Sequence, residues 1–247
     1  MGRSPVVRRI AMWSGPRNLS TALMRAWENR PDAWVVDEPL YAFYLDRTGK
    51  DHPGRDAVIA SQPTDWRPVA DGLAGGCRQG RSVFYQKHMA HHLLPEVDRG
   101  WIDALDNCFL IRDPGAVVAS YVRSREAVAL EDLGYEVQAE LFHRERARTG
   151  RVPPVVDAAD ILADPAGVLG ALCRALDVPW DERMLSWPAG PRDSDGVWAT
   201  HWYASVWRST GFDPPRPGRA ALADGLLPLA AAAEPYYREL HRHRLTG

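Results

Sequence analysis

Short apolar runs alternate with amphipathic segments along most of this chain. Apolar runs bounded by polar residues are typical of central parallel strands covered on both faces, and apolar positions at helical spacing predict helices between them. This alternation predicts an α/β protein with three α/β/α layers around a mostly parallel sheet. The expected strands are 6–13, 34–36, 82–87, 107–111 and 152–156, and the expected helices are 20–28, 114–125, 131–149, 165–176 and 219–243, the last with a break at Pro235.

One stretch does not follow this pattern. Residues 47–81 mix glycine, proline, aspartate and arginine with weak helical patches. Such composition is typical of loops, so we expect an irregular, partly helical insertion over one face of the sheet.

Composition narrows the class of protein. The 247 residues, 45% of them hydrophobic and 25% charged, fit one domain spanning residues 1–247 with a sizeable core. A protein that binds nucleic acids or membrane surfaces in general needs an excess of basic residues, and the net charge of −2 argues against that class. Cys77, Cys108 and Cys173 are too few and too far apart for a disulfide framework or a zinc site, and no apolar run is long enough to span a membrane. We therefore expect a soluble, cytoplasmic protein that is a monomer or a homodimer.

The segment 10–23, IAMWSGPRNLSTAL, has the layout of an anion-binding site. It predicts a buried strand, a tight Gly-Pro loop and a helix whose first turn carries Ser20 and Thr21. The start of a helix offers backbone N–H groups and a partial positive charge to an anion, and Arg17 adds a full charge. The chain has no G-x-x-x-x-G-K-[ST] match, so this P-loop-like site favours a ligand other than ATP.

A second basic site is expected at the end of strand 107–111. Arg112 follows the strand, Asp113-Pro114 opens a helix, and Ser120 lies eight residues after the arginine. An arginine at the carboxyl end of a strand and a hydroxyl two helical turns later can both contact a phosphate in the crevice outside the sheet. Two separate phosphate sites are therefore predicted.

These two motifs resemble those of the sulfotransferase superfamily, whose sulfonyl donor is 3′-phosphoadenosine 5′-phosphosulfate (PAPS). Residues 16–21 resemble the family's Pro-[Lys/Arg]-Ser-Gly-Thr-Thr loop for the 5′-phosphosulfate, with Asn18-Leu19 in place of Ser-Gly. Arg112-x-Pro114 with Ser120 resembles the arginine and serine that bind the 3′-phosphate. The resemblance implies a donor site made by Pro16, Arg17, Asn18, Leu19, Ser20, Thr21, Arg112 and Ser120.

The resemblance also implies catalytic residues, from two branches of the superfamily. The segment 22–26 and its spacing to Asp37-Glu38 resemble tyrosylprotein sulfotransferases, in which the glutamate is the base and a strand lysine, here Lys87, assists the transferred group. His88-Met89 with the following Leu-Leu-Pro is similar to cytosolic sulfotransferases, in which the histidine is the base. Glu38 is ranked first as base and His88 is the alternative.

A later segment resembles the loop that closes over the nucleotide. Arg192, Gly196 and Trp198, followed by His201-Trp202, match its pattern with one residue fewer. The resemblance implies that these residues contact the donor and that Trp198 covers the adenine. A tryptophan followed by aromatic residues at helical spacing is otherwise typical of a core.

The expected reaction is in-line transfer of a sulfonyl group from PAPS to a hydroxyl or amine of a small-molecule acceptor. Arg17 and Lys87 supply the positive charge that stabilises the transition state, and Glu38 or His88 removes the acceptor proton. No metal is expected, and the adjacent His91 and His92 are interpreted as core or solvated residues. Two alternatives remain: a non-catalytic module that binds an adenosine bisphosphate, and a P-loop-type kinase.

Overall fold

The computed structural model describes residues 7–76, 78, 80–122, 128–214 and 222–247. Its centre is a five-stranded sheet in the order β2-β3-β1-β4-β5, with every neighbouring pair parallel. The sheet confirms the prediction of a mostly parallel α/β protein. The strands are β1 Arg8–Ser14, β2 Ala33–Asp37, β3 Val83–Met89, β4 Asp106–Ile111 and β5 Val155–Asp157.

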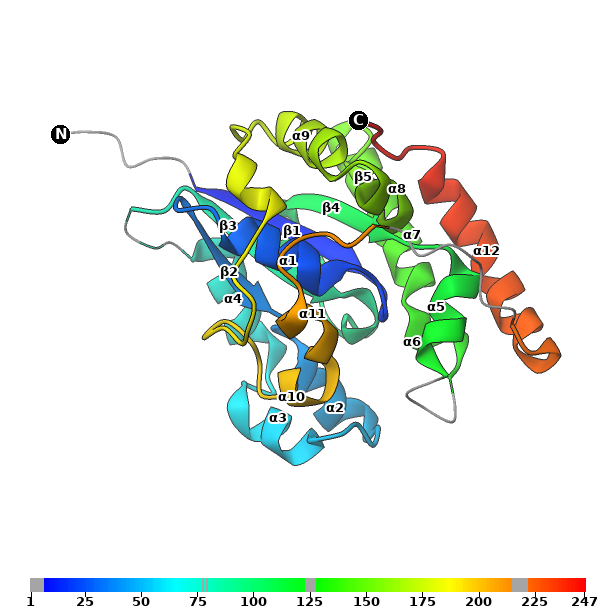
Figure 1. The fold of residues 1–247 in the computed structure, drawn as a ribbon. Helices are drawn as coiled ribbons and strands as arrows, with labels where there is room; N and C mark the ends of the chain where they lie inside the picture. The colour runs from blue at the N-terminus through cyan, green and yellow to red at the C-terminus, as the bar shows by residue number, and fades with distance from the viewer. Residues whose placement is uncertain (1–6, 77, 79, 123–127, 215–221) are drawn as a thin grey trace.

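Alternate side chains of the strands pack into two different hydrophobic clusters. On β1, Ile10 and Met12 join a cluster with α1 (Ser20–Glu28) and α9 (Pro165–Ala175), while Ala11 and Trp13 face a second cluster on the other side. Because successive strand residues point to opposite faces, both faces of the sheet are covered and the fold has three layers (Figure 1). The second cluster includes residues of α2 (Tyr41–Thr48), α7 (Tyr135–Thr149) and α12 (Leu227–His241).

The remaining elements connect these layers. Several of them lie at the ends of strands, where they border the site described below. They are α3 (Arg55–Ser61), α4 (Trp66–Gly75), η1 (Ala90–His92), η2 (Gly100–Ala104), α5 (Pro114–Tyr121), α6 (Leu130–Leu133), α8 (Ala158–Ala163), η3 (Glu182–Leu185), α10 (Ala199–Trp202), α11 (Ala204–Arg208) and η4 (Asp224–Leu226).

The structure corrects three expectations about helices. The insertion 47–81 is more regular than expected, since α3 and α4 occupy much of it. The helix expected over 131–149 is two helices, because Gly134 at a φ of 72° takes the left-handed conformation between α6 and α7. The final helix continues through Pro235 without a break. Its expected start at 219, like the expected helix end at 123–125, lies outside the described residues.

The carboxyl ends of the parallel strands share one edge of the sheet. The chain leaves β1 through Gly15, where an added Cβ would lie 2.4 Å from the Leu133 carbonyl oxygen. Only glycine allows the loop to pass that close to α6, so Gly15 fixes the path from β1 into α1. This edge therefore holds the loop 15–19, the end of β2 at Asp37 and the residues that follow β4.

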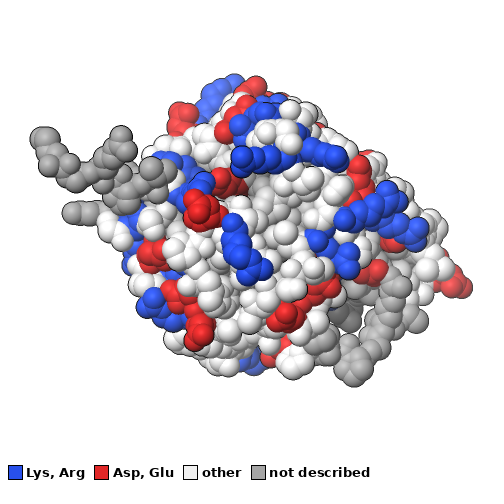
Figure 2. Space-filling view, turned by 90° about the horizontal axis from the view of Figure 1, so that it is seen from above, with Lys and Arg blue, Asp and Glu red and all other residues white. Residues whose placement is uncertain are grey.

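Charges of both signs are mixed over the surface. Figure 2 views the molecule from the top of Figure 1 and shows lysine and arginine interspersed with aspartate and glutamate on that face. Among the residues that the structure describes, no helix is long and apolar enough to cross a membrane.

Candidate active site

A cavity of about 280 Å³ lies where the carboxyl ends of the strands meet. It brings together the predicted anion-binding loop, the arginine and serine after β4, and two of the three expected groups from β2 and β3. The residues of the sequence-based hypothesis that line it are Pro16, Arg17, Asn18, Leu19, Ser20, Thr21, Glu38, Lys87, Arg112 and Ser120.

The two expected phosphate sites are joined through Arg17. Its backbone has a φ of 53°, which turns the loop back toward β4, and its carbonyl oxygen accepts a hydrogen bond from Arg112 Nη1 at 2.6 Å. Its side-chain Nε donates to Ser120 Oγ at 3.1 Å. Two arginines and a serine thus surround one end of the cavity, next to the start of α1, which has no side-chain cap and no acidic residue in its first turn. This end is suited to a ligand with several negative charges.

Asn18 takes a structural role within the loop. Its Nδ2 donates to the Leu110 carbonyl oxygen at 3.0 Å, and its Oδ1 accepts from the Leu19 N–H at 2.8 Å. The side chain therefore ties the loop to the end of β4. This explains how the loop is held in place although Asn18-Leu19 replaces the Ser-Gly of the family pattern.

Glu38 occupies an unusual backbone conformation directly after β2. Its φ of 40° lies in the left-handed region, which is costly for a residue other than glycine. Hydrogen bonds hold it there: its N–H donates to the Lys87 carbonyl oxygen at 2.9 Å, and its own carbonyl oxygen accepts from the Tyr41 N–H at 3.0 Å and from Gln62 Nε2 at 3.2 Å. The conformation turns the carboxylate into the cavity.

A buried ionic cluster lies beneath Glu38. Lys87 Nζ donates to Asp37 Oδ1 at 2.7 Å, to Glu38 Oε1 at 2.6 Å and to Tyr203 Oη at 2.7 Å. Burial raises the pKa of Glu38 and the charge of Asp37 raises it further, against the effect of the Lys87 ammonium. Two carboxylates share one ammonium, so Glu38 takes up a proton more readily than an ordinary glutamate does.

Asp37 and Tyr203 were not identified as site residues from the sequence. The sequence singles out Asp37 only by its spacing, and the aromatic residues Trp198, Trp202, Tyr203 and Trp207 at helical spacing predict a core position for Tyr203. The one available signal was the position of Asp37, a charged residue at the end of an otherwise apolar strand.

His88 does not reach the cavity. It follows Lys87 within β3, so its side chain points to the opposite face of the sheet and stacks on Trp13 with ring centroids 4.3 Å apart. Its Nε2 lies 3.1 Å from Gln86 Oε1, and burial lowers the pKa of His88 to about 3. A ring held neutral in the core, away from the other site residues, cannot take the acceptor proton in this arrangement.

Arg192, Gly196 and Trp198 also lie outside the cavity wall. The Arg192 N–H donates to Asp195 Oδ2 at 2.9 Å, and Gly196 packs on the Trp198 ring, where any Cβ would clash. Trp198 is 2% exposed and donates from Nε1 to Tyr203 Oη at 3.2 Å. In this structure the segment 192–198 does not contact the cavity but holds the Tyr203 hydroxyl through the Trp198 hydrogen bond.

The same segment is fastened to α1 by a buried ion pair. Arg25 is 1% exposed and donates to carboxylates of Asp195 and Glu28. Asp195 also accepts from Trp207 Nε1 at 2.9 Å. The chain around residue 195 is thereby fixed between α1 and α11.

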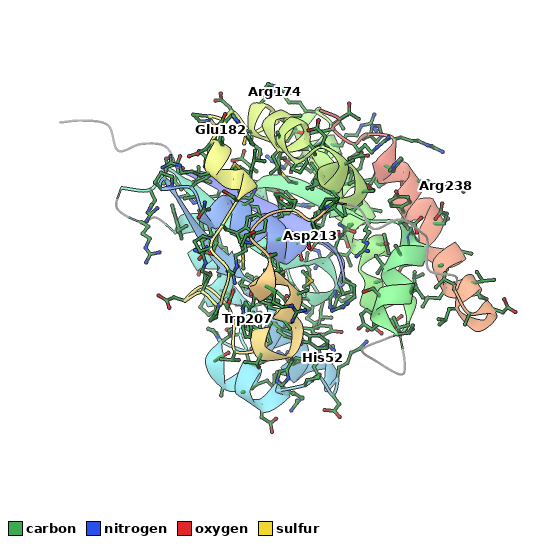
Figure 3. All side chains as sticks on the ribbon, viewed as in Figure 1. His52, Arg174, Glu182, Trp207, Asp213 and Arg238 are labelled. Carbon is green, nitrogen blue, oxygen red and sulfur yellow. The ribbon has the colours of Figure 1, made fainter. Side chains whose placement is uncertain are left out.

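Histidines and tyrosines form the wall of the cavity beyond Glu38. His91 and His92, interpreted from sequence as core or solvated, are buried and line the cavity together with Tyr41 and His52. Tyr41 Oη lies 2.6 Å from His52 Nδ1, and the Tyr41 ring stacks on His92 at 4.6 Å. Figure 3 shows His52 on the same lower side of the molecule as Trp207 of α11.

His92 adds no positive charge to this wall. Burial lowers the pKa of His92 well below its usual value, and the neighbouring histidines lower it further, so the ring is neutral at pH 7. Within the described parts of the chain, no group of three or more His, Cys, Asp or Glu side chains is arranged to hold a metal ion. The end of the cavity beyond Glu38 is therefore largely aromatic, in contrast to the arginine end.

A comparison with protein families agrees with this arrangement. Residues 8–244 match the family model described as "Sulfotransferase domain". The match covers nearly the whole chain, so the protein belongs to the sulfotransferase domain family.

Two solved structures share the fold. One is the "Sulfotransferase Domain from the Synechococcus PCC 7002 Olefin Synthase", with a TM-score of 0.55 and 20% identity over 94% of this chain and 96% of that one. The other is a sulfotransferase from Alicyclobacillus acidocaldarius, with a TM-score of 0.54 and 15% identity over 99% of this chain and 98% of that one. Both confirm the fold class.

Two curated relatives from Arabidopsis thaliana carry a different name. "Branched-chain-amino-acid aminotransferase-like protein 1" is 36% identical over 208 residues, which are 84% of this chain and 37% of that protein. The similarly named protein 2 is 32% identical over 84% of this chain and 36% of that protein. The chain spans just over a third of the length of these relatives.

Proposed function

We propose that this protein transfers a sulfonyl group from PAPS to a hydroxyl or amine of a small-molecule acceptor, with Glu38 as the base. The observation that carries this proposal is the Glu38 carboxylate in the same cavity as the anion-binding loop, Arg112 and Ser120. Membership of the sulfotransferase domain family supports it.

The arginine end of the cavity suits the donor. PAPS carries a 5′-phosphosulfate and a 3′-phosphate, and the residues present are two arginines, two hydroxyls at the start of α1 and the Ser120 hydroxyl. Residues 16–21 would hold the phosphosulfate, and Arg112 with Ser120 would hold the 3′-phosphate. The carboxylate that lines the cavity, Glu38, has its charge compensated by Lys87, so it does not oppose an anionic donor.

The chemistry requires one proton acceptor and fixed positive charge. As the acceptor oxygen or nitrogen bonds to sulfur, its proton passes to Glu38, and the bond from sulfur to the 5′-phosphate oxygen breaks with its electron pair on that oxygen. The products are the sulfonylated acceptor and 3′-phosphoadenosine 5′-phosphate (PAP). Arg17 and Lys87 would stabilise the charge that spreads over the transferred group.

The aromatic end of the cavity suits the acceptor. It adjoins Glu38 and is lined by aromatic side chains, among them Tyr41, His52 and the neutral ring of His92. A charged acceptor would lose hydration there without an opposite charge to compensate it, so an uncharged, partly apolar compound is favoured. The aminotransferase-like name of the plant relatives belongs to proteins more than twice as long, and the residues gathered in this cavity do not point to that chemistry.

Incubation with PAPS and a panel of small hydroxyl and amine compounds tests this function. We expect PAP to form together with an equal amount of sulfonylated product, detected by mass spectrometry. ATP-dependent phosphorylation of the panel would favour the kinase alternative. Tight PAP binding with no product from any compound would favour the non-catalytic module.

A further inference from the structure

The Lys87 ammonium has no hydrogen left for a substrate. An ammonium group has three N–H donors, and those of Lys87 point to Asp37, Glu38 and Tyr203 at 2.6 to 2.7 Å. Lys87 is 1% exposed, so these three protein groups are its main hydrogen-bond partners. To stabilise a transferred sulfonyl group, Lys87 must first release one of the three.

Two of the three partners of Lys87, Asp37 and Tyr203, are also hydrogen-bonded to each other. The Tyr203 hydroxyl donates its single hydrogen to Asp37 Oδ2 at 2.6 Å and accepts from Lys87 and from Trp198 Nε1. Asp37 is 4% exposed and does not line the cavity, whereas Tyr203 does line it. Removing Lys87 from Asp37 would leave a buried carboxylate oxygen without its hydrogen bond, which is costly, and Tyr203 holds Asp37 in place through the other oxygen.

Glu38 is the partner that can be exchanged. Its carboxylate lines the cavity, and it is the group expected to take up a proton during the reaction. A protonated carboxyl no longer attracts an ammonium as a carboxylate does, so its contact with Lys87 weakens at the moment the proton arrives.

We propose that Asp37 and Tyr203 are positioning residues that hold Lys87 charged and in place, while Glu38 releases one Lys87 N–H to the departing group when it takes the acceptor proton. This inference rests on the proposed function. Atoms and charges balance as in the transfer step: the acceptor proton ends on Glu38, the electron pair of the broken bond ends on the 5′-phosphate oxygen, and Lys87 keeps its three protons and changes one hydrogen-bond partner.

The electrostatics of the cluster agree with this division of roles. Burial lowers the pKa of Lys87, but the Asp37 and Glu38 carboxylates together raise it well above its usual value. Asp37 also raises the pKa of Glu38. Without the charge of Asp37, the pKa values of both Lys87 and Glu38 should fall.

The first test needs no acceptor. Carbon-13 NMR of glutamate side-chain carboxyls, with the Glu38 signal assigned by its loss in Glu38→Gln, follows the titration of Glu38 in the full-length protein. We expect the Glu38 pKa to fall in Asp37→Asn. An unchanged Glu38 titration in a folded Asp37→Asn protein would overturn the coupling.

The second test separates binding from turnover. Tyr203→Phe keeps the ring, whose centroid lies 5.1 Å from Lys87 Nζ, and removes only the hydroxyl. We expect kcat with PAPS to fall about tenfold or more, as for the loss of one charge-assisted hydrogen bond, with the PAP dissociation constant unchanged. Unchanged kcat would overturn the positioning role.

A matched pair elsewhere in the fold provides the control. Tyr237 Oη donates to Asp157 Oδ2 at 3.0 Å. Asp157 is the last residue of β5, in the same way that Asp37 is the last residue of β2. Tyr237→Phe and Asp157→Asn remove the same type of bond outside the cavity and should leave kcat and the Glu38 titration unchanged. If the wild-type protein fails to bind PAP, the proposed function fails; if PAP binds and only the Tyr203 and Asp37 results are negative, this inference alone fails.

Discussion

Glu38→Gln is expected to lower turnover with PAPS by about 10² to 10⁴-fold, the usual contribution of a positioned base. The amide keeps an oxygen for Lys87 Nζ, which lies 2.6 Å from Glu38 Oε1 in the wild type, but it does not accept the acceptor proton. Because Glu38 lies beyond the anion-binding loop, PAP should bind the variant as it binds the wild type. Initial rates of PAP formation and a PAP titration on the same preparation measure the two effects.

His88→Phe is the matched variant, because a phenylalanine ring can still stack on Trp13. It should retain most of the turnover, since His88 points away from the cavity. Wild-type turnover in Glu38→Gln would remove Glu38 from the mechanism. Loss of turnover in a folded His88→Phe protein that still binds PAP would transfer the role of base to His88.

Lys87→Met is expected to destabilise the fold by roughly 3–5 kcal/mol, the usual cost of breaking a buried ion pair. The variant leaves Asp37 and Glu38 as two buried carboxylates without their ammonium. Urea unfolding at pH 7 measures the loss. The double variant Lys87→Met with Asp37→Asn removes one of the two charges and should recover part of it.

The pH dependence of this variant gives an independent check. Burial raises the pKa of Glu38, and without the opposing Lys87 ammonium this pKa lies further above its value in the unfolded chain. The folded state then binds more protons than the unfolded state, so the deficit in stability should shrink from pH 8 to pH 5. A deficit independent of pH would mean that lost packing, and not uncompensated charge, causes the destabilisation.

The strand ends and the anion-binding loop could be predicted from the sequence because their signals are local. The run 10–23 contains the strand, the loop and the helix start, and the nine residues from Arg112 to Ser120 span one strand end and two helical turns. The local pattern therefore predicts two phosphate sites, and the resemblance to the sulfotransferase superfamily implies that residues 16–21, Arg112 and Ser120 bind one donor.

The prediction that His88 lies at the site is wrong because strand β3 extends further than the sequence pattern indicates. The apolar run predicts a strand that ends at Lys87, which leaves His88 free to turn into the cavity, whereas β3 continues to Met89. Side chains alternate along a strand, so Lys87 and His88 point to opposite faces. The face on which His88 lies therefore depends on where the strand ends. The sequence does not mark this end, because polar residues such as Gln86 and Lys87 interrupt the apolar run.

The ionic cluster could not be predicted because its members are distant in the chain. Asp37 and Lys87 are register partners on β2 and β3, a pairing that requires the order of the strands. Tyr203 lies 166 residues beyond Asp37 and reaches it only because the segment 192–207 is fastened to α1 through Arg25 and Asp195. Long-range packing, and not local pattern, places these groups.

The most direct test of the donor site is a calorimetric titration of the purified protein with PAP, with AMP, ADP and ATP in parallel. Each charge-assisted hydrogen bond to the 3′-phosphate contributes roughly 1.5–3 kcal/mol, so Arg112 and Ser120 should favour PAP over AMP by on the order of 100-fold. The preference should disappear in Arg112→Ala and persist in Arg174→Ala, which changes an exposed arginine on α9 at the top of Figure 3. Equal affinity for PAP and AMP, or tighter binding of ATP, would contradict a PAPS-dependent sulfotransferase.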